Sequence, residues 1–453
     1  MSLNDLLNKK IGILGLGQEG LAVVRYLQKH NIDPVVYDKK DVRPQDINVK
    51  IVSGDQYLRK AIEESEIIFR SPGVKIPSEF NDLISEKGVI ITSQTIWFFN
   101  NCPARIIGVT GTKGKGTTCS LLFSILEKYS ETKDTFKPYL TGNIGKDQPF
   151  DFIEDLTKND LVVYELSSFQ LQDLKKSPYL GITLMVTEDH LDYHSDLTEY
   201  HSAKSAISAY QSENDIQIFN ADYEPSRQIG ELGSGQKWMV SSKTEINKGA
   251  KILESSIIIK GDKDTEITID TTRRNLRGKH NLENIAAASL AATILGVDLE
   301  TIQSCVDNFK GLKHRLQLVA DKDGVTFYND SISTIPEATM AALNSFTEPI
   351  ILLLGGASKN LDYTELVKFI ESKENLKAVI TIGETGDELY SLIGKSNYQG
   401  QLHGPYTNFA EAVDKAKSIG MSGDVVLLSP AATSFDMFKS YADRGEQFIE
   451  LVS

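Results

Sequence analysis

Residues 106–118 read IIGVTGTKGKGTT, and this stretch decides the fold. An apolar run enters a glycine-rich loop, and a helical pattern, CSLLFSILEKY, follows at 119–129. Glycines allow the backbone amides of such a loop to curl around an anion, Lys115 can reach the terminal phosphates of a nucleotide, and a following hydroxyl can bind Mg²⁺. The loop is one residue shorter than the usual P-loop spacing, and Gly116 stands where a Ser or Thr normally follows the lysine, so we expect Thr117 to supply the hydroxyl. The pattern predicts a nucleotide-binding strand–loop–helix unit.

A second glycine pattern opens the chain. Gly15, Gly17 and Gly20 form GxGxxG between a predicted strand and a predicted helix, and Asp38 ends the next strand. This arrangement puts backbone amides and a helix N-terminus against a phosphate, with an acid near a ribose. Taken alone, it is also compatible with a nicotinamide-dependent dehydrogenase or with a tight turn that binds nothing. Two nucleotide-type loops on separate domains disfavour a simple dehydrogenase, and we expect one loop to serve activation and the other to hold a substrate.

Composition indicates a globular protein that works without nucleic-acid or membrane partners. The chain has 453 residues, of which 40% are hydrophobic and 24% charged, and this length suggests about three domains. The net charge of −14 argues against nucleic acids and anionic membranes, whose phosphates require a basic surface. No apolar run is long enough to span a bilayer, the N-terminus lacks the apolar core of a signal peptide, and the three cysteines form no paired framework. We therefore expect a cytoplasmic protein without membrane insertion.

The order of the predicted elements indicates an α/β protein with three domains in series. Residues 1–100 predict a small Rossmann-like domain, and residues 101–311 a central P-loop ATPase-like domain that carries a β-hairpin at 251–270. In residues 312–453, the strands VTFYND, PIILLLGG, KAVITIG and DVVLLSP alternate with helical stretches, which predicts a second Rossmann-like domain with a parallel sheet.

Polar residues follow two further strands of the central domain. Glu165 ends the strand LVVYE, one strand beyond the glycine loop, where a carboxylate is well placed to hold Mg²⁺. His190 lies among three acids in TEDHLD, just past another apolar strand, which favours a metal or phosphate role over a structural one. Lys204 follows on a predicted helix, and periodicity alone indicates a solvated surface lysine.

Six motifs occur in the order found in Mur ligases: GTKGKGTT, YELSSFQL, TEDHLDYH followed by Lys204, GKHNLENIAAA, GLKHRLQ and LSPAATSFDMF. With the GxGxxG opening and the turn Ser71-Pro72-Gly73, the chain resembles the glutamate-adding branch of this family over nearly its whole length. The resemblance implies an ATP-dependent ligase that phosphorylates the carboxylate of UDP-N-acetylmuramoyl-L-alanine and joins it to glutamate, with D-glutamate favoured, in peptidoglycan synthesis. It also implies two Mg²⁺ sites, a carbamylated lysine, and a monomer whose partners are these small molecules.

The resemblance further implies which residues form each site. Catalysis would involve Lys115, Glu165, His190 and Lys204, the last as a carbamate. The UDP substrate would be bound by Gly15, Leu16, Gly17, Gln18, Asp38, Lys39, Ser71, Pro72, Gly73, Asn143, Ser167 and Gln170. ATP would be bound by Gly111, Thr112, Lys113, Gly114, Lys115, Gly116, Thr117, Asn281, Asn284, Arg315 and Asp330. Glutamate would be bound by Thr334, Lys359, Ser434, Phe435 and Tyr441. Metal ligands would be Thr117, Glu165, His190 and carbamylated Lys204.

The chain departs from the family pattern in the stretch DSISTI at 330–335, where Ile332 replaces a lysine, and at Tyr441, which replaces a common Phe. A sister branch of ligases that adds L-glutamate has a similar DSIST stretch, so L-glutamate remains an alternative. Folylpolyglutamate synthetase shares the GTxGKG loop but lacks the N-terminal glycine domain. A dehydrogenase would leave Lys115, Glu165 and His190 without a role. An inactive nucleotide-binding protein is suggested by Gly116 and Ile332 and opposed by the presence of these same polar residues with Lys204.

Overall fold

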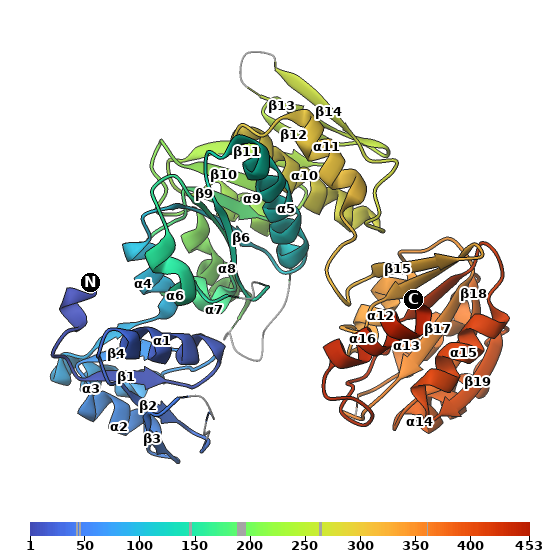
Figure 1. Cartoon of the computed structure of the whole chain (residues 1–453), viewed down its shortest axis with the longest axis horizontal. Helices are drawn as coiled ribbons and strands as arrows, with labels where there is room; N and C mark the ends of the chain where they lie inside the picture. Colours follow the sequence, from blue (N-terminus) through green and yellow to red (C-terminus); the bar gives the residue numbers. More distant parts are fainter. Residues whose placement is uncertain (42–43, 45–46, 145–146, 188–195, 262–264, 360) are drawn as a thin grey trace. The chain divides into compact units, whose positions relative to one another are not determined.

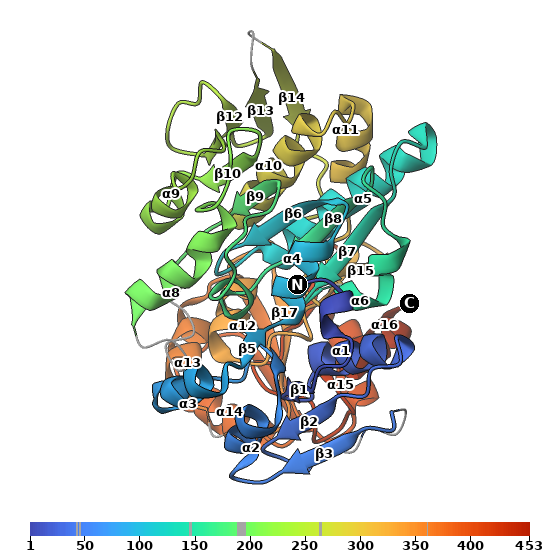
Figure 2. The same cartoon turned by 90° about the vertical axis from the view of Figure 1, so that its left-hand side faces the viewer.

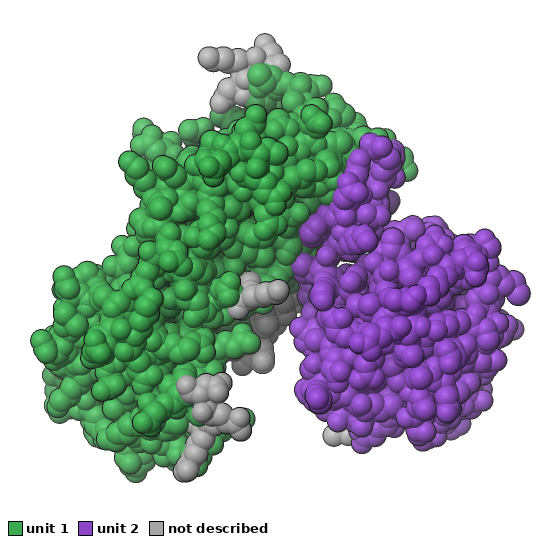
Figure 3. Space-filling view, in the orientation of Figure 1, with its two compact units in different colours: residues 1–270, 283–305 green, residues 271–282, 306–453 purple. Residues whose placement is uncertain are grey.

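The computed structural model describes residues 1–41, 44, 47–144, 147–187, 196–261, 265–359 and 361–453. The described chain forms two compact units, Met1–Asp270 with Glu283–Cys305, and Thr271–Leu282 with Val306–Ser453 (Figure 3). Three sheets follow one another along the chain, which confirms the prediction of an α/β protein with domains in series. No helix in the described ranges has the length and apolarity that crossing a bilayer requires.

The N-terminal domain is built on a parallel five-stranded sheet with the order β3-β2-β1-β4-β5 (Figure 1). Its strands are β1 (Ile11–Leu14), β2 (Val35–Asp38), β3 (Lys50–Ser53), β4 (Ile67–Arg70) and β5 (Ile90–Thr92). Its helices are α1 (Gln18–Lys29), α2 (Tyr57–Glu64), α3 (Asn81–Lys87) and α4 (Gln94–Asn101). The strand order reverses between β1 and β4, and in open α/β sheets such a point leaves a crevice at the carboxyl ends of the two strands.

The central domain is built on a nine-stranded sheet with the order β14-β13-β12-β11-β10-β9-β6-β8-β7. Its strands are β6 (Arg105–Thr110), β7 (Pro138–Gly142), β8 (Leu161–Glu165), β9 (Leu180–Thr183), β10 (Ile216–Asn220), β11 (Gln236–Ser241), β12 (Gly249–Ile252), β13 (Ser256–Lys260) and β14 (Glu266–Asp270). Helices in this part of the chain are α5 (Lys115–Lys133), α6 (Pro149–Phe152), α7 (Ser168–Leu171), α8 (Leu197–Lys204), α9 (Glu224–Gly230), α10 (Lys279–Ile294) and α11 (Leu299–Asn308). β13 and β14 pair antiparallel at the edge of the sheet, as the predicted hairpin requires (Figure 2).

Aromatic packing joins the N-terminal domain to the central one. The rings of Tyr26 on α1 and Trp97 on α4 both contact Phe150 on α6, at centroid distances of 4.7 and 5.0 Å. These rings belong to one apolar cluster that also contains core residues of both sheets. The cluster explains why the first two domains form a single compact unit.

The C-terminal domain is built on a six-stranded sheet with the order β15-β16-β20-β17-β18-β19, parallel except for β15 with β16. Its strands are β15 (Gln317–Lys322), β16 (Val325–Asn329), β17 (Ile350–Gly355), β18 (Leu376–Ile382), β19 (Gln401–Tyr406) and β20 (Val425–Leu428). Its helices are α12 (Pro336–Leu343), α13 (Thr364–Ser372), α14 (Gly386–Gly394), α15 (Phe409–Ile419) and α16 (Tyr441–Val452). Alternate residues of β17 enter two separate apolar clusters, Leu352 and Leu354 with α12, α13 and α14, and Ile351 and Leu353 with α15 and α16. The sheet is therefore covered on both faces, which accounts for the continuous apolar run of β17.

Candidate functional site

The loop between β6 and α5 has the backbone that an anion site requires. Gly111 and Gly114 have φ angles of +153° and +86°, which side chains on a β-carbon rarely allow. A β-carbon on Gly114 would lie 2.2 Å from Asn284 Oδ1, so the glycine also permits close packing against α10. Thr118 Oγ1 donates to the same Asn284 oxygen at 3.4 Å. The loop is thus held in a fixed shape in front of the N-terminus of α5, where backbone amides favour a phosphate.

Two lysines meet at one carbonyl of this loop. Lys115 Nζ donates to the carbonyl oxygens of Gly111 at 2.9 Å and Thr112 at 3.1 Å. Lys204 Nζ approaches the same Gly111 oxygen at 3.4 Å and lies 4.6 Å from the ring centroid of Tyr200. The Lys204 residue is only 1% exposed, so the surface position that periodicity predicted is wrong. Helical periodicity could not place it, because its burial depends on a loop that lies far away in the sequence.

Tyr200 fastens α8 to the glycine loop. Its hydroxyl lies 3.0 Å from Thr112 Oγ1, which also donates to the Thr187 carbonyl and accepts from the Thr187 amide. Sequence reasoning did not single out Tyr200, although it stands one helical turn before Lys204. The contact fixes the distance between the loop and the buried lysine.

Glu165 lies at the end of β8, opposite Val109 of the neighbouring strand β6, and is buried. Its carboxylate and the Lys115 ammonium both affect the electrostatics of Cys119, whose pKa is raised well above its ordinary value, chiefly by burial. The thiol therefore stays protonated and inert. Thr117 is buried in the first turn of α5, and its position supports the predicted hydroxyl role.

His190 lies outside the described residues. Among the residues that the structure does describe, no three His, Cys, Asp or Glu side chains gather around a common metal position. The Thr117 hydroxyl, the Glu165 carboxylate and a glycine loop that a β-carbon would obstruct nevertheless fit a nucleotide with its metal ion.

A cavity of about 390 Å³ opens at the crevice between β1 and β4. It brings together nine of the twelve residues predicted to bind the UDP substrate: Gly15, Leu16, Gly17, Gln18, Asp38, Ser71, Pro72, Gly73 and Asn143. Lys39, Ser167 and Gln170 do not line it, although Gln170 binds Glu19, which does. Glu19, Val74, Gly142 and Gln148 complete the wall and were not predicted.

The glycine loop at this cavity is fixed by two side chains. Ser71 Oγ donates to the Gly15 carbonyl at 2.8 Å. The two carboxylate oxygens of Asp38 accept from the amides of Leu16 at 2.8 Å and Lys40 at 2.9 Å. Asp38 therefore orients the loop through backbone amides. In a dinucleotide-binding fold, an acid at this place instead receives a ribose hydroxyl.

Arg70 was not predicted from the sequence, yet it supports the turn that closes this cavity. It is 6% exposed, and its guanidinium donates to the carbonyls of Pro72 at 3.3 Å and Val74 at 2.9 Å. It also pairs with the carboxylate of Asp173, which follows α7 of the central domain. A larger cavity of about 680 Å³ is lined by Arg70, Asp173 and others but by none of the predicted site residues.

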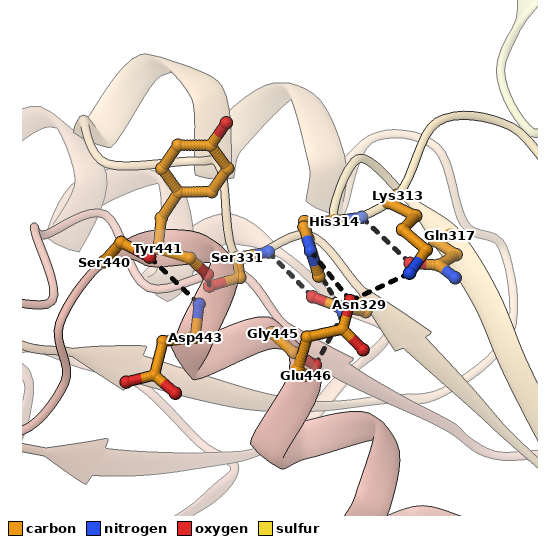
Figure 4. A network of polar contacts seen from close by, with 10 residues as sticks. All are labelled: Lys313, His314, Gln317, Asn329, Ser331, Ser440, Tyr441, Asp443, Gly445 and Glu446. Carbon is orange, nitrogen blue, oxygen red and sulfur yellow. Dashed lines mark hydrogen bonds and ion pairs between the residues drawn. The ribbon is translucent and has the colours of Figure 1, made fainter. Parts of the chain in front are cut away.

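In the C-terminal domain, backbone strain surrounds Arg315. His314 and Leu316 have φ angles of +63° and +40°, an uncommon conformation for residues other than glycine. The His314 ring nitrogen Nδ1 lies 3.0 Å from Asn329 Nδ2, as Figure 4 shows, and the Leu316 amide donates to Asp330 at 3.1 Å. Strained residues of this kind gather at ligand sites, which supports a binding role for Arg315.

Asp330 is buried at the end of β16. Its carboxylate accepts from the hydroxyls of Ser333 at 2.6 Å and Ser429 at 2.8 Å. Burial raises the pKa of Asp330 to about 6, against the lowering effect of these hydrogen bonds. The acid thus joins the loop after β16 to the end of β20.

The residues predicted to bind glutamate lie in the loops after β16, β17 and β20 and at the start of α16. β17 and β20 are parallel neighbours, and the Ala357 amide after β17 donates to the Thr433 carbonyl after β20 at 2.8 Å. Lys359 and Phe435 are exposed, Ser434 is buried and Thr334 is partly buried. The carbonyl oxygen of Tyr441 accepts from Ser331 Oγ at 2.7 Å (Figure 4). The Tyr441 side chain is exposed.

Arg444, on α16, binds the loops after β16 and β20 and was not predicted from the sequence. It is 1% exposed, and its guanidinium donates to the hydroxyl and carbonyl of Ser331 at 2.9 and 2.8 Å. It also donates to the carbonyls of Ala432 at 3.1 Å and Thr433 at 3.0 Å. Burial lowers the pKa of Arg444 to about 10, so the group remains a cation at neutral pH.

Comparison with known proteins matches each part of the chain to one family. Residues 9–93 match the Mur ligase MurD-like N-terminal domain, residues 109–292 the Mur ligase middle domain, and residues 314–432 the Mur ligase glutamate ligase domain. The UDP-N-acetylmuramoylalanine–D-glutamate ligase of Clostridium kluyveri is 35% identical over 98% of this chain and 96% of its own length. The enzyme of the same name from Acetivibrio thermocellus is also 35% identical, over 100% and 98%.

Solved structures show the same fold at lower identity. UDP-N-acetylmuramate–alanine ligase MurC of Thermotoga maritima superposes with a TM-score of 0.57 at 17% identity, over 98% of this chain and 99% of its own. MurF ligase of Thermotoga maritima, solved in complex with ADP, gives a TM-score of 0.55 at 17% identity, over 99% and 98%. These likenesses establish the three-domain architecture.

Proposed function

Because the chain belongs to the Mur ligase family, and to its MurD-like branch, we propose that it joins D-glutamate to UDP-N-acetylmuramoyl-L-alanine at the expense of ATP. It is an ATP-dependent amide ligase of peptidoglycan precursor synthesis. Its proposed partners are these small molecules, met in the cytoplasm by a monomer.

Two steps make up the proposed reaction. A carboxylate oxygen of the muramoyl-alanine attacks the γ-phosphorus of ATP, and the bond from that phosphorus to the ADP oxygen breaks. The glutamate amine then attacks the acyl carbon of the acyl-phosphate, phosphate leaves with the acyl–oxygen bond pair, and the amine gives up a proton. The net products are the amide, ADP, phosphate and a proton.

The central loop provides the positive charge that the first step requires, because a carboxylate and a triphosphate repel each other. Amides of residues 111–117 would hold the phosphates, and Lys115 would move from the loop carbonyls to the γ-phosphate. Asn281 and Asn284 would bind the adenine, with Arg315 and Asp330 completing the nucleotide site. Mg²⁺, when bound, offsets the charge that gathers between the two substrates.

Lys204 is proposed to act as a carbamate. The ammonium first loses one proton, and the resulting amine adds to CO₂ with loss of a second proton, so that a buried cation becomes an anion. The support is its position, since an ammonium there lies beside Lys115 on one carbonyl, whereas an anion would attract Lys115 and support a metal ion. With Glu165, Thr117 and His190, the last assigned from sequence alone, it would hold Mg²⁺.

The cavity between β1 and β4 is proposed to bind the UDP moiety, on the strength of the nine predicted residues that line it. The use of both Asp38 oxygens by backbone amides argues against a dinucleotide in the same place. Lys359, Thr334, Ser434, Phe435 and Tyr441 are proposed to bind glutamate, with the lysine pairing to its side-chain carboxylate.

The alternative that specific evidence favours is L-glutamate, because Ile332 removes a cation from the amino-acid site. Phosphate release measured with UDP-N-acetylmuramoyl-L-alanine, ATP and either D-glutamate or L-glutamate separates the two alternatives. A preference for D-glutamate of roughly 100-fold or more would reflect polar partners left unpaired by the wrong isomer. A preference for L-glutamate would overturn the assignment of D-glutamate as substrate. Equal use of D-norvaline, which lacks the side-chain carboxylate, would contradict a pocket for that carboxylate.

A further inference from the structure

An acid lines the cavity that we assign to a diphosphate. Glu19 lies in the first turn of α1 and is one of the residues that line the 390 Å³ cavity with Gly15, Gly17 and Ser71. Backbone amides of the glycine loop and the N-terminus of α1 favour an anion there. An ionised Glu19 would place a negative charge in the space that the diphosphate needs.

The Glu19 carboxyl is held on one side only. Its Oε1 accepts from Gln170 Nε2 at 2.7 Å, and the Gln170 side-chain oxygen is fixed by the amide of Ser167 at 2.9 Å and its hydroxyl at 3.1 Å. Its Oε2 is enclosed and has no hydrogen-bond partner in the described part of the chain. The carboxyl is therefore positioned by the central domain and retains one free, buried oxygen.

The surroundings provide little to stabilise a negative charge on Glu19. The cation that lowers the pKa of Glu19 is Arg70 of β4, and its guanidinium already binds two carbonyls and Asp173. The buried phenol of Tyr164 on β8 interacts electrostatically with Glu19, and Asp38 of β2 lines the same cavity. Burial raises the pKa of Glu19 to about 7, although Gln170 and Arg70 both act to lower it.

We propose that this cavity takes up its UDP-sugar together with one proton, which resides on the carboxyl of Glu19. The proton comes from solvent and removes the charge that would repel the diphosphate. Glu19 is thus a specificity-determining group of the substrate site. The inference rests on the proposed function of this cavity.

Calorimetric titration of the whole protein with UDP-N-acetylmuramoyl-L-alanine tests the proposal. The diphosphate of this probe is esterified at both ends, so the ligand does not titrate near neutral pH. If only the neutral form of Glu19 binds, the affinity falls roughly 20-fold between about pH 6.5 and about pH 8.5. The binding heat of the unmodified protein near pH 7 also varies between buffers of different ionisation enthalpy, because a proton is taken up.

Two variants isolate the carboxyl. Glu19→Gln keeps an acceptor for Gln170 and adds a neutral donor, so its affinity should be the same at both pH values. Glu63→Gln removes an exposed acid of α2 that pairs with Arg59, and it should keep the pH dependence of the unmodified protein.

The possible outcomes distinguish a failure of the proposed role of Glu19 from a failure of the proposed UDP site. Equal affinity of the unmodified protein at both pH values, with no buffer-dependent heat, overturns the role of Glu19 and leaves the UDP site in place. A pH dependence that persists in Glu19→Gln also overturns it. Absence of binding at every pH overturns the UDP site itself.

Discussion

The two glycine loops of this chain have the same order of strand, loop and helix, but the side chains around them differ in charge. Each follows a parallel strand and opens a helix, and each has a carbonyl that accepts from side chains. At Gly111 the donors are Lys115 and Lys204, whereas at Gly15 the donor is the hydroxyl of Ser71. In the first helical turn, the central loop has Lys115 and the N-terminal loop has Glu19. This difference in charge supports the proposal that the central loop serves chemistry and the N-terminal loop holds a substrate.

Lys115→Ala should have the largest effect, because it removes the cation from the loop that we assign to chemistry. We expect kcat to fall by about 10³-fold, with thermal unfolding unchanged. Lys133→Ala, on the exposed end of the same helix, is the matched control. Near-normal turnover in a folded Lys115→Ala protein would contradict the distinction between the loops.

Lys204→Ala should rank second. Loss of the proposed carbamate should lower turnover by about 10²-fold, and short carboxylic acids should restore part of it by filling the vacated anion position. Carbon-13 resonance of the unmodified protein in labelled bicarbonate should show a carbamate. Full activity of the variant, or no carbamate at any bicarbonate concentration, would leave Lys204 as a structural cation.

Glycine replacements test how tightly the backbone of the N-terminal loop is constrained. A β-carbon on Gly20 would lie 2.3 Å from the Gly15 carbonyl oxygen, whereas one on Gly17 meets nothing within 4 Å. Gly20→Ala should therefore destabilise the protein by about 2 kcal/mol, and Gly17→Ala by less than about 0.5 kcal/mol. Thermal unfolding measures both, and equal effects would show that the loop geometry is not constrained as described.

Asp38→Asn should have the smallest effect. The amide group cannot accept from both the Leu16 and Lys40 amides, so the N-terminal loop should loosen. We expect affinity for the UDP-sugar to fall about tenfold while ATP affinity is unchanged. Asp33→Asn, on the exposed segment before β2, controls for the loss of charge. A matching loss of ATP affinity would mean that Asp38 acts on the whole unit.

The site residues that could be predicted from the sequence are chiefly those whose role depends on a single continuous segment of chain. The glycine loops, Lys115 and Glu165 follow from a strand, a turn and a helix read in order, and the structure places them accordingly. Periodicity alone indicated a surface position for Lys204, because a charged residue on a short helix gives no sign of the loop that buries it, and only the family resemblance gave this lysine a role in the site. Glu19, Arg70 and Arg444 were missed for a related reason, since each has a partner from a segment distant in sequence. These partners are Gln170, Asp173 and Ser331, respectively. Their side chains carry no motif, and only the assembled fold shows their partners.

The contacts of Arg70 predict which residues related sequences keep together. Its guanidinium is shared between the turn at Pro72 and Val74 and the carboxylate of Asp173, so one buried cation depends on two domains. Loss of Asp173 alone leaves the buried Arg70 cation without its carboxylate, which is costly, whereas Asp173 is half exposed and tolerates the loss of Arg70. Relatives that keep Arg70 should therefore also keep an acid at the position of Asp173, and an aligned set of sequences tests this dependence.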